Sequence, residues 1–272
     1  MRRNVLISII MILVIISFNC KSKELEIDPE IASNEQALFE MGEKFIKKNP
    51  EKGRLYLRQV IDSFPKSFYA QRAMLAIADS YYRKGNESNM IIAASEYREF
   101  ISRFPYSPSA PYAQYRIAMT YFTQSNKPGK DQTKTKNALA EFKNLVTKYP
   151  NSEEAEMANE KIKECEEKLA KHSLLIAEYY YKVKTYKASI DRLKEILTKY
   201  PNFSEMDKLY FYLADSYYQS KQEEEALPYF RKLISDYPDS KFAKKARKRL
   251  EEYEEKQDNI NKDSSYLKIS WR

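Results

Sequence analysis

The sequence predicts an all-α protein built from repeated helix pairs, and three observations support this prediction. Apolar residues recur at helical spacing along most of the chain. Only 4 glycines occur in 272 residues. No alternating strand pattern appears before the last few residues. Repeated helix pairs build their core from contacts between neighbouring pairs, so a chain of this kind needs no central cluster.

Five segments share one register of small, aromatic and proline residues. A small residue is followed three positions later by an aromatic one at Gly42/Phe45, Ala78/Tyr81, Ala118/Tyr121, Ala177/Tyr180 and Ala214/Tyr217. A second small residue stands twelve positions before a proline at Gly53, Ala93, Ala138, Ser189 and Ala226. The prolines, each preceded by Phe or Tyr, are Pro65, Pro105, Pro150, Pro201 and Pro238. This register is the tetratricopeptide signature. The fold class is therefore a tetratricopeptide-repeat solenoid of five helix pairs plus a C-terminal capping helix.

The first residues of the chain are predicted to form a targeting segment. Arg2 and Arg3 precede an apolar run, Val5 to Ile16, that is too short to span a bilayer. A cysteine, Cys20, follows that run, as in a bacterial lipobox, although Asn19 stands where a small residue is usual. We expect residues 1–19 to be a lipoprotein signal peptide and Cys20 to be acylated. The alternative is an ordinary signal peptide in which Cys20 is incidental.

The remaining chain divides into four expected segments. Residues 20–33 form a lipidated tether, and residues 34–150 form an N-terminal module of three repeat units. Residues 151–257 hold one long connecting helix, two further units and the capping helix. Residues 258–272 form a flexible tail that is either frayed or able to add as an edge strand to a partner. Unit three carries an insertion, Gln124 to Thr135, which is either a partner-contacting loop or a solvated one.

Catalytic and metal-binding chemistry finds no support in the sequence. If Cys20 is acylated, Cys165 is the one thiol left, and its helical pattern predicts a small buried apolar group. The single histidine, His172, has no nucleophile pattern around it. No phosphate-binding glycine loop or metal-ligand spacing is present. The net charge of +8 favours anionic surfaces or acidic partners. We expect no enzyme activity, no cofactor and no nucleic-acid partner.

The first helix of each N-terminal unit supplies a candidate peptide-binding groove. Its expected lining residues combine aromatic rings with arginines, which suit an extended peptide that ends in an aromatic residue and a carboxylate. The alternative is that several of these residues pack between units. The groove residues are Phe39, Glu43, Arg72, Leu75, Asp79, Tyr82, Arg83, Tyr112, Tyr115, Met119 and Phe122.

Several stretches resemble the BamD family, the tetratricopeptide lipoproteins of the outer-membrane β-barrel assembly (BAM) machine. The resemblance covers roughly residues 34–250. It rests on Tyr149-Pro150-Asn151-Ser152, Lys168-Leu169-Ala170-Lys171, Ile176-Ala177-Glu178-Tyr179-Tyr180 and the closing Tyr200-Pro201. The first two units match in repeat register only.

The resemblance implies a scaffold that is lipid-anchored on the periplasmic face of the outer membrane. It implies that the C-terminal units bind the periplasmic domains of the barrel-forming subunit and that the N-terminal units receive unfolded outer-membrane proteins for insertion. Arg192 matches a partner-contacting arginine of the family, or else it is a solvated surface residue. A second function class stays open, in which the chain is a periplasmic repeat protein that coordinates cell-wall or Tol-Pal envelope complexes.

Overall fold

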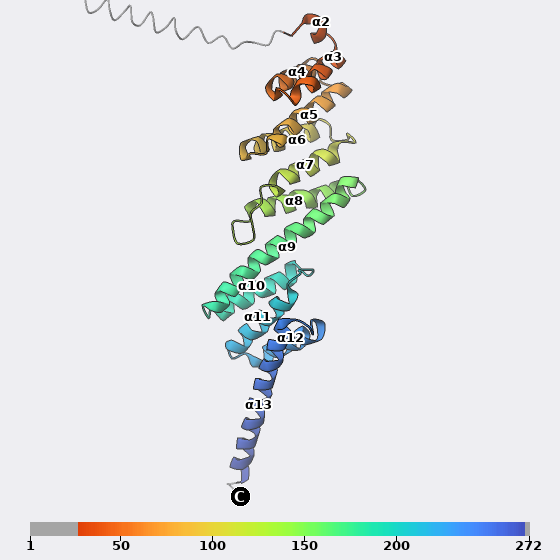
Figure 1. The fold of residues 1–272 in the computed structure, drawn as a ribbon. Helices are drawn as coiled ribbons and strands as arrows, with labels where there is room; N and C mark the ends of the chain where they lie inside the picture. Colours follow the sequence, from red (N-terminus) through yellow and green to blue (C-terminus); the bar gives the residue numbers. More distant parts are fainter. Residues whose placement is uncertain (1–26, 270–272) are drawn as a thin grey trace, which may run out of the picture. The chain divides into compact units, whose positions relative to one another are not determined.

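A computed structural model of the chain describes residues 27–269, and the side chains to residue 259. Every regular element in this described range is a helix (Figure 1). The predicted signal peptide and Cys20 lie outside it. The helices are α2 (Pro29–Ala32), α3 (Glu35–Ile46), α4 (Pro50–Ser63), α5 (Phe68–Lys84), α6 (Glu87–Arg103), α7 (Ala110–Phe122), α8 (Thr133–Lys148), α9 (Glu153–Lys182), α10 (Tyr186–Lys199), α11 (Met206–Gln219), α12 (Glu223–Asp236) and α13 (Lys241–Ile269).

The predicted helix pairs are present, and one turn ends the second helix of each pair. An aromatic residue caps each of these helices with ψ between 55° and 64°, and its backbone N–H still bonds to the carbonyl four residues back. The proline that follows has no N–H to continue the helix, and it disfavours helical geometry in the residue before it. The five capping residues are Phe64, Phe104, Tyr149, Tyr200 and Tyr237.

A second turn connects the two helices within a pair. Lys184 and Lys221 adopt φ of 61° and 63°, in the left-handed region where the chain reverses direction. The next amide in each case, that of Thr185 or Gln222, bonds back to the carbonyl of Tyr180 or Tyr217, at 2.9 and 3.0 Å. Units four and five therefore use the same turn, as their shared register predicts.

The chain divides into two compact parts, one through Ala113 and one from Gln114. The dividing point falls within α7, whereas the sequence analysis placed a module boundary after Pro150. The physical reason is that α9 packs on α8 as well as on α10. Ala158 and Cys165 of α9 join a core cluster with Phe142 of α8, which binds unit three to the units that follow.

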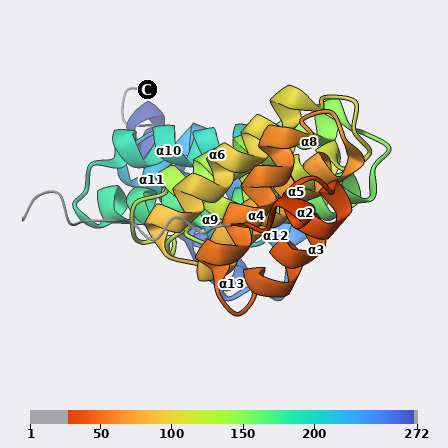
Figure 2. The same ribbon diagram turned by 90° about the horizontal axis from the view of Figure 1, so that it is seen from above.

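In the second part, α9 is the predicted long helix. Ser152 caps its N-terminus by accepting a hydrogen bond from the Ala155 amide at 3.2 Å. The C-terminal half of α9 contributes Leu174 and Ala177 to a core cluster that also holds residues of α10, α11, α12 and α13. Helices α10 and α11 lie side by side in both views of the ribbon (Figures 1 and 2).

Two ends of the described chain differ from the sequence expectation. No helix was assigned to the tether from the sequence, and Pro29–Ala32 forms a short helix capped by Asp28. Helix α13 passes through the predicted end of the cap at Gln257 and continues to Ile269, past the other packed helices (Figure 1). The residues from Asp258 to Ile269 are thus helical in the isolated chain, and their addition as an edge strand to a partner stays a prediction. Glu, Lys and Gln, which are good helix formers, carry the helix through Gln257.

In the first part, α3 and α4 cross at two glycines. A Cβ on Gly53 would lie 2.5 Å from the backbone N and Cα of Ile46. A Cβ on Gly42 would lie 2.5 Å from the Leu57 side chain. The Gly53 site is the stricter one because backbone atoms cannot move aside as a flexible side chain can.

We expect Gly53→Ala to lower the free energy of unfolding by about 1 to 3 kcal/mol, the usual cost of overpacking. Alanine is the better helix former, so any loss must come from pushing α3 and α4 apart. Urea unfolding followed by circular dichroism measures the change. Gly129→Ala is the control, because its Cβ would meet only Leu175 Cδ1 at 4.0 Å. A Gly53→Ala protein as stable as the control variant would contradict the close crossing.

Candidate functional site

The predicted groove residues fall into two groups, one in each part of the chain. Those from Phe39 to Tyr112 belong to the first part, and Tyr115, Met119 and Phe122 belong to the second. Each group is therefore described by itself. The structure places some of these side chains at the surface and others in packing contacts, so the two alternatives left open by the sequence apply to different residues.

In the first part, the exposed side chain of an arginine, Arg72, packs against two phenylalanine rings. The guanidinium carbon of Arg72 lies 4.4 Å from the centre of the Phe39 ring and 5.8 Å from that of Phe68. Arg72 also pairs with Glu43, with 3.8 Å between Nη2 and Oε2. The Arg72 side chain is 46% exposed and Phe68 is 67% exposed. A cation beside an exposed ring can hold a carboxylate and an apolar side chain together.

Phe39 is the buried member of this cluster. It is only 2% exposed and packs against the Tyr69 ring at 5.4 Å. Leu75 and Tyr82, further along α5, are half-buried, and Arg83 is exposed near the end of the helix. Four of the predicted groove residues on α5 therefore have solvent-exposed surface: Arg72, Leu75, Tyr82 and Arg83.

Asp79 and Tyr112 form a polar contact within the packing of the first part. The Asp79 carboxylate accepts hydrogen bonds from the Tyr97 hydroxyl and, at 2.8 Å, from the Tyr112 hydroxyl. The rings of Tyr97 and Tyr112 also meet edge to face, with centroids 6.4 Å apart. This arrangement ties α5, α6 and α7 together, which is the packing role that the sequence analysis kept as the alternative.

In the second part, the remaining groove residues pack against α8. Tyr115 and Phe122 place their rings 5.7 and 5.9 Å from that of Phe142, and Met119 joins the same cluster. Lys161 of α9 covers the Phe122 ring, with its ammonium nitrogen 4.8 Å from the centroid. These three side chains therefore join α7, α8 and α9.

Arg192 lies at the surface of α10 in a small ion network. Its Nη1 is 3.0 Å from Oε2 of Glu195, and the other Glu195 oxygen is 2.7 Å from Nζ of Lys199. The hydrogen bond from Lys199 lowers the pKa of the Glu195 carboxyl below its usual value. Arg192 is 46% exposed, so a partner can reach its guanidinium.

An exposed apolar face on α9 was missed by the sequence analysis. Leu175, Tyr179 and Val183 follow one another at intervals of four and are 46%, 62% and 49% exposed. Their spacing is a helical one and could have been found. It was overlooked because Ala177 and Tyr180 in the same stretch already satisfied the repeat register.

The insertion of unit three is docked on α9. Nζ of Lys168 donates to the Ser125 hydroxyl at 2.6 Å, and Nδ1 of His172 lies 2.6 Å from the Pro128 carbonyl oxygen. Inside the loop, the buried Gln132 amide donates to the carbonyls of Lys127 and Lys130. His172 therefore positions the loop, in keeping with the packing role expected for it.

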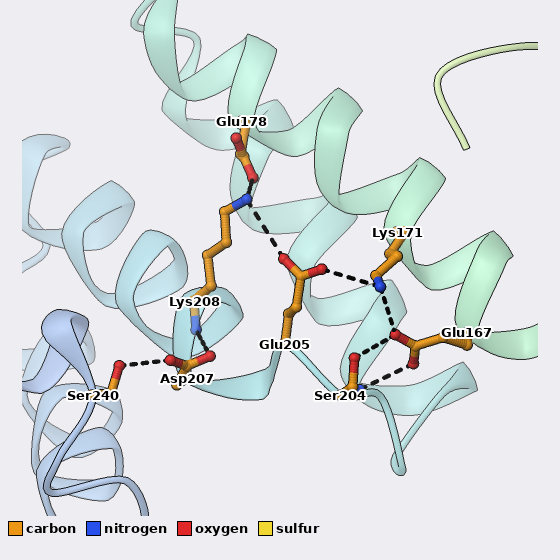
Figure 3. A network of polar contacts seen from close by, with 8 residues as sticks. All are labelled: Glu167, Lys171, Glu178, Ser204, Glu205, Asp207, Lys208 and Ser240. Atoms are coloured by element: carbon orange, nitrogen blue, oxygen red, sulfur yellow. Dashed lines mark hydrogen bonds and ion pairs between the residues drawn. The ribbon is translucent and has the colours of Figure 1, made fainter. Parts of the chain in front are cut away.

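A chain of polar contacts joins α9 to α11 and to the start of α13 (Figure 3). Glu167 accepts hydrogen bonds from the Ser204 amide, at 3.0 Å, and from its hydroxyl. Lys171 pairs with Glu167 and Glu205, while Lys208 pairs with Glu178 and Glu205. The Asp207 carboxylate, beside Lys208, accepts from the Ser240 hydroxyl. These contacts fix the turn before α11 against the long helix.

The ion pairs of this network shift the pKa values of its members. Burial disfavours a charged Glu167, but the two hydrogen bonds from Ser204 outweigh it and lower the pKa of Glu167 below its usual 4.5. Burial likewise opposes a charged Lys208, but the contact with Glu178 outweighs it and raises the pKa of Lys208 above its usual 10.5. Both shifts favour the charged forms of Glu167 and Lys208 at neutral pH.

Reactive chemistry is not visible in the part of the chain that the structure describes. Cys165 is fully buried, as predicted, and burial raises the pKa of its thiol to about 11. Across residues 27–269, no group of three His, Cys, Asp or Glu side chains is arranged to hold a metal ion. Within the same range, no helix has both the length and the apolar character needed to cross a membrane.

The helix pairs define a tetratricopeptide-type protein. Comparison with known families narrows this class. The YfiO family, described as "Outer membrane lipoprotein", matches residues 31–226, which is well over half of the chain. The chain belongs to this family.

Relatives with assigned names agree with that family. The "Outer membrane protein assembly factor BamD" of Caulobacter vibrioides is 33% identical over 171 residues, which cover 63% of this chain and 55% of the relative. The protein of the same name from Rickettsia prowazekii is 26% identical over 259 residues and covers 93% of this chain and 100% of that relative. The match with the Caulobacter relative thus spans little more than half of that protein's length.

A solved structure similar to this chain is the "TPR2AB-domain:pHSP90-complex of yeast Sti1". It is 16% identical, covers 84% of this chain and 87% of its own, and superposes with a TM-score of 0.40. A TM-score of this size carries no functional weight.

We expect Glu167→Gln to lower the free energy of unfolding by about 1 kcal/mol at pH 7, because a neutral amide is a weaker acceptor for Ser204 and a poorer partner for Lys171. The lowered pKa of Glu167 means that its carboxylate stabilises the fold fully above pH 4.5. This contribution is lost as the pH falls through the lower pKa of the folded state.

The difference between wild type and Glu167→Gln should therefore shrink as the pH falls below 4.5. Chemical unfolding at a series of pH values measures it. Glu160→Gln, on the same helix and in an exposed pair with Lys163, is the control and should have little effect at any pH. A pH-independent difference for Glu167→Gln would contradict the ionic role.

Proposed function

We propose that this protein is a lipid-anchored scaffold of outer-membrane β-barrel assembly that carries no catalytic activity of its own. The observation that carries the proposal is the family match over residues 31–226. It is supported by relatives named as outer membrane protein assembly factors, one of which aligns along 93% of this chain. The surfaces described above consist of exposed cations and rings, which suit protein recognition.

The proposed anchor is an acyl group on Cys20. The residue follows an apolar run typical of a secretory signal, and Lys21 follows it, as in lipoproteins exported to the outer membrane. This places the helix pairs on the periplasmic face. The residues between Cys20 and the first long helix are few, so the anchor holds the first part of the chain close to its membrane.

The second part is proposed to bind the periplasmic domains of the barrel-forming subunit through α10. Arg192 is the central residue because its guanidinium is exposed and turned to an acidic neighbour that a partner carboxylate can replace. The exposed face of Leu175, Tyr179 and Val183 on α9 adds apolar surface to the same part of the chain.

The first part is proposed to receive unfolded outer-membrane proteins at the Arg72 cluster. Arg72 supplies a positive charge whose partner Glu43 lies at 3.8 Å, a distance that leaves the pair weak and replaceable. Phe68 supplies exposed ring surface next to it. This pairing of charge and ring fits the chain end of a peptide that finishes in an aromatic residue.

We expect Arg192→Glu to reduce recovery of the barrel-forming subunit roughly tenfold when the tagged full-length protein is purified from detergent-solubilised membranes. The substitution replaces an attraction with a repulsion at the proposed interface. Its cost to α10 is about 0.2 to 0.5 kcal/mol, from the new like-charge pair with Glu195. Quantitative identification of the co-purifying proteins measures the effect.

Arg231→Glu on α12 is the matched control, since Arg231 is also an exposed helix residue. It should leave recovery unchanged. Wild-type protein that instead co-purifies with cell-wall synthases or Tol-Pal components would overturn the assembly role and favour the envelope-coordination alternative. Equal recovery with both variants would overturn the role of Arg192.

We expect Arg72→Ala to weaken binding of a synthetic peptide with a C-terminal phenylalanine by about five- to tenfold, the loss of one charge-assisted contact. Fluorescence anisotropy with the full-length protein in detergent measures it. Arg103→Ala is the control, because the Arg103 side chain is equally exposed, at 46%, and pairs with Glu99 away from the aromatic cluster.

The same peptide with an amidated C-terminus separates the contributions of charge and ring. It should bind wild-type protein as weakly as the free-acid peptide binds Arg72→Ala. An amidated peptide that binds as tightly as the free acid would show that Arg72 does not recognise a chain terminus.

A further inference from the structure

A hollow lies where α9, α11 and α13 meet in the second part of the chain. Its volume is about 350 Å³, within the range of sites that bind small groups. The lining residues are Tyr181, Phe211, Tyr212, Asp215, Lys245, Lys248, Arg249 and Glu252. The lining residues from α9 and α11 lie within the range of the family match, and those from α13 lie beyond its end at residue 226.

The floor of the hollow is a buried ionic contact. The Asp215 side chain is 1% exposed and accepts hydrogen bonds from the Tyr181 hydroxyl and, at 2.8 Å, from Nε of Arg249. The remaining donors of Arg249 include Nη1, which lies 2.8 Å from Glu252. Arg249 therefore pairs with both carboxylates, and these three side chains, which together carry one negative charge, form one side of the hollow.

The walls are aromatic. Tyr181 and Tyr212 meet edge to face with centroids 5.0 Å apart, and Phe211 and Phe242 lie 5.5 Å apart. Tyr181 and Tyr212 are only half-buried, so parts of these rings face the hollow. Such a surface accepts an apolar side chain with little loss of conformational entropy.

The rim is positively charged. Nζ of Lys245 lies 5.5 Å from the Phe211 ring and 5.7 Å from the Phe242 ring, so its contacts are with aromatic faces. Lys248 is 78% exposed and only loosely paired with Glu252, at 4.0 Å. Both ammonium groups thus lie at the rim of the hollow, and both side chains are exposed to solvent.

The charges along α13 run against the helix dipole. The cations Lys241, Lys244, Lys245, Arg247, Lys248 and Arg249 all precede the acidic run of Glu251, Glu252, Glu254 and Glu255, and the first turn holds no acidic residue. A helix N-terminus favours acidic side chains and disfavours basic ones. Only Lys241 and Lys244 lie in the first turn, where the dipole acts, and the other four cations extend the basic stretch along the helix, where an acidic partner can meet them.

We propose that this basic hollow binds an acidic segment of a partner protein, with an apolar side chain in the aromatic hollow and carboxylates on Lys245 and Lys248. Several carboxylates are needed because several cations line the first turns of α13, and a single chain terminus supplies only one. A membrane surface could bind the exposed cations, but it would leave the aromatic hollow unused. The proposal does not depend on the assembly role.

The test uses the full-length protein in detergent and a fluorescent synthetic peptide of Asp and Glu residues around a central Leu. Wild-type protein should bind this peptide, and Lys245→Glu should weaken binding at least tenfold. Replacing the central Leu with Gly should weaken it about threefold or more, as expected for one buried apolar side chain. Circular dichroism confirms folding of the variant, in which the altered side chain is exposed.

Lys136→Glu on α8 is the matched control and should bind like wild type, because Lys136 is exposed and α8 contributes no residue to the hollow. Absence of peptide binding, or equal binding by Lys245→Glu, would overturn the proposal. Vesicles containing phosphatidylglycerol form the second arm. Vesicle binding that is lost in Lys245→Glu, with no binding of the peptide, would overturn it in favour of a membrane contact.

Discussion

The aromatic–proline turn that ends each second helix is the constraint on which the rest of this structure depends. Proline removes the donor that would continue the helix, and the preceding aromatic residue turns to a ψ near 60°. The same turn occurs after α4, α6, α8, α10 and α12 and ends each of these helices in the same way. The aromatic ring also packs against the helices. The aromatic–proline pair therefore both ends the helix and contributes to the packing.

Helix α9 shows how an irregular repeat can still form a continuous core. At 30 residues it is long enough to pack against both α8 and α10. Its two halves contribute to the clusters around Phe142 and around Leu193. The polar network along α9 then fixes the turn before α11 (Figure 3). Apolar packing brings these helices together, and the ion pairs select one arrangement of the connecting turns. Arg192 and the basic hollow are presented by the part of the chain that this arrangement holds together.

Two of the proposed binding surfaces, the Arg72 cluster and the basic hollow, share one chemical design. In each, a long cationic side chain lies against an aromatic ring: Arg72 on Phe39, and Lys245 on Phe211 and Phe242. The ring orders the cation at little cost and offers apolar surface beside it. A carboxylate next to an apolar side chain fits such a pair. This design explains how a chain with a net charge of +8 can recognise acidic partners through a few defined places rather than through charge alone.

The candidate site could be predicted in part. Arg72 and Arg192 were named from the sequence, and both are exposed. Of the other groove residues, Phe39 lies under Arg72, Asp79 bonds to two tyrosines, and Phe122 packs on Phe142. The helical register says which residues share a face, but it does not say whether a neighbouring helix covers that face.

By itself, the sequence determined the number of helix pairs, their caps and their ends, because proline, serine caps and small–aromatic spacing act within a few residues of the chain. It also determined the long uninterrupted helix, which contains neither proline nor glycine. Only the tertiary structure decided that α9 joins unit three to the units after it, that the inserted loop docks on Lys168 and His172, and that Lys245 stands beside an aromatic hollow. These features depend on contacts between residues far apart in sequence, which the local pattern of the chain does not specify.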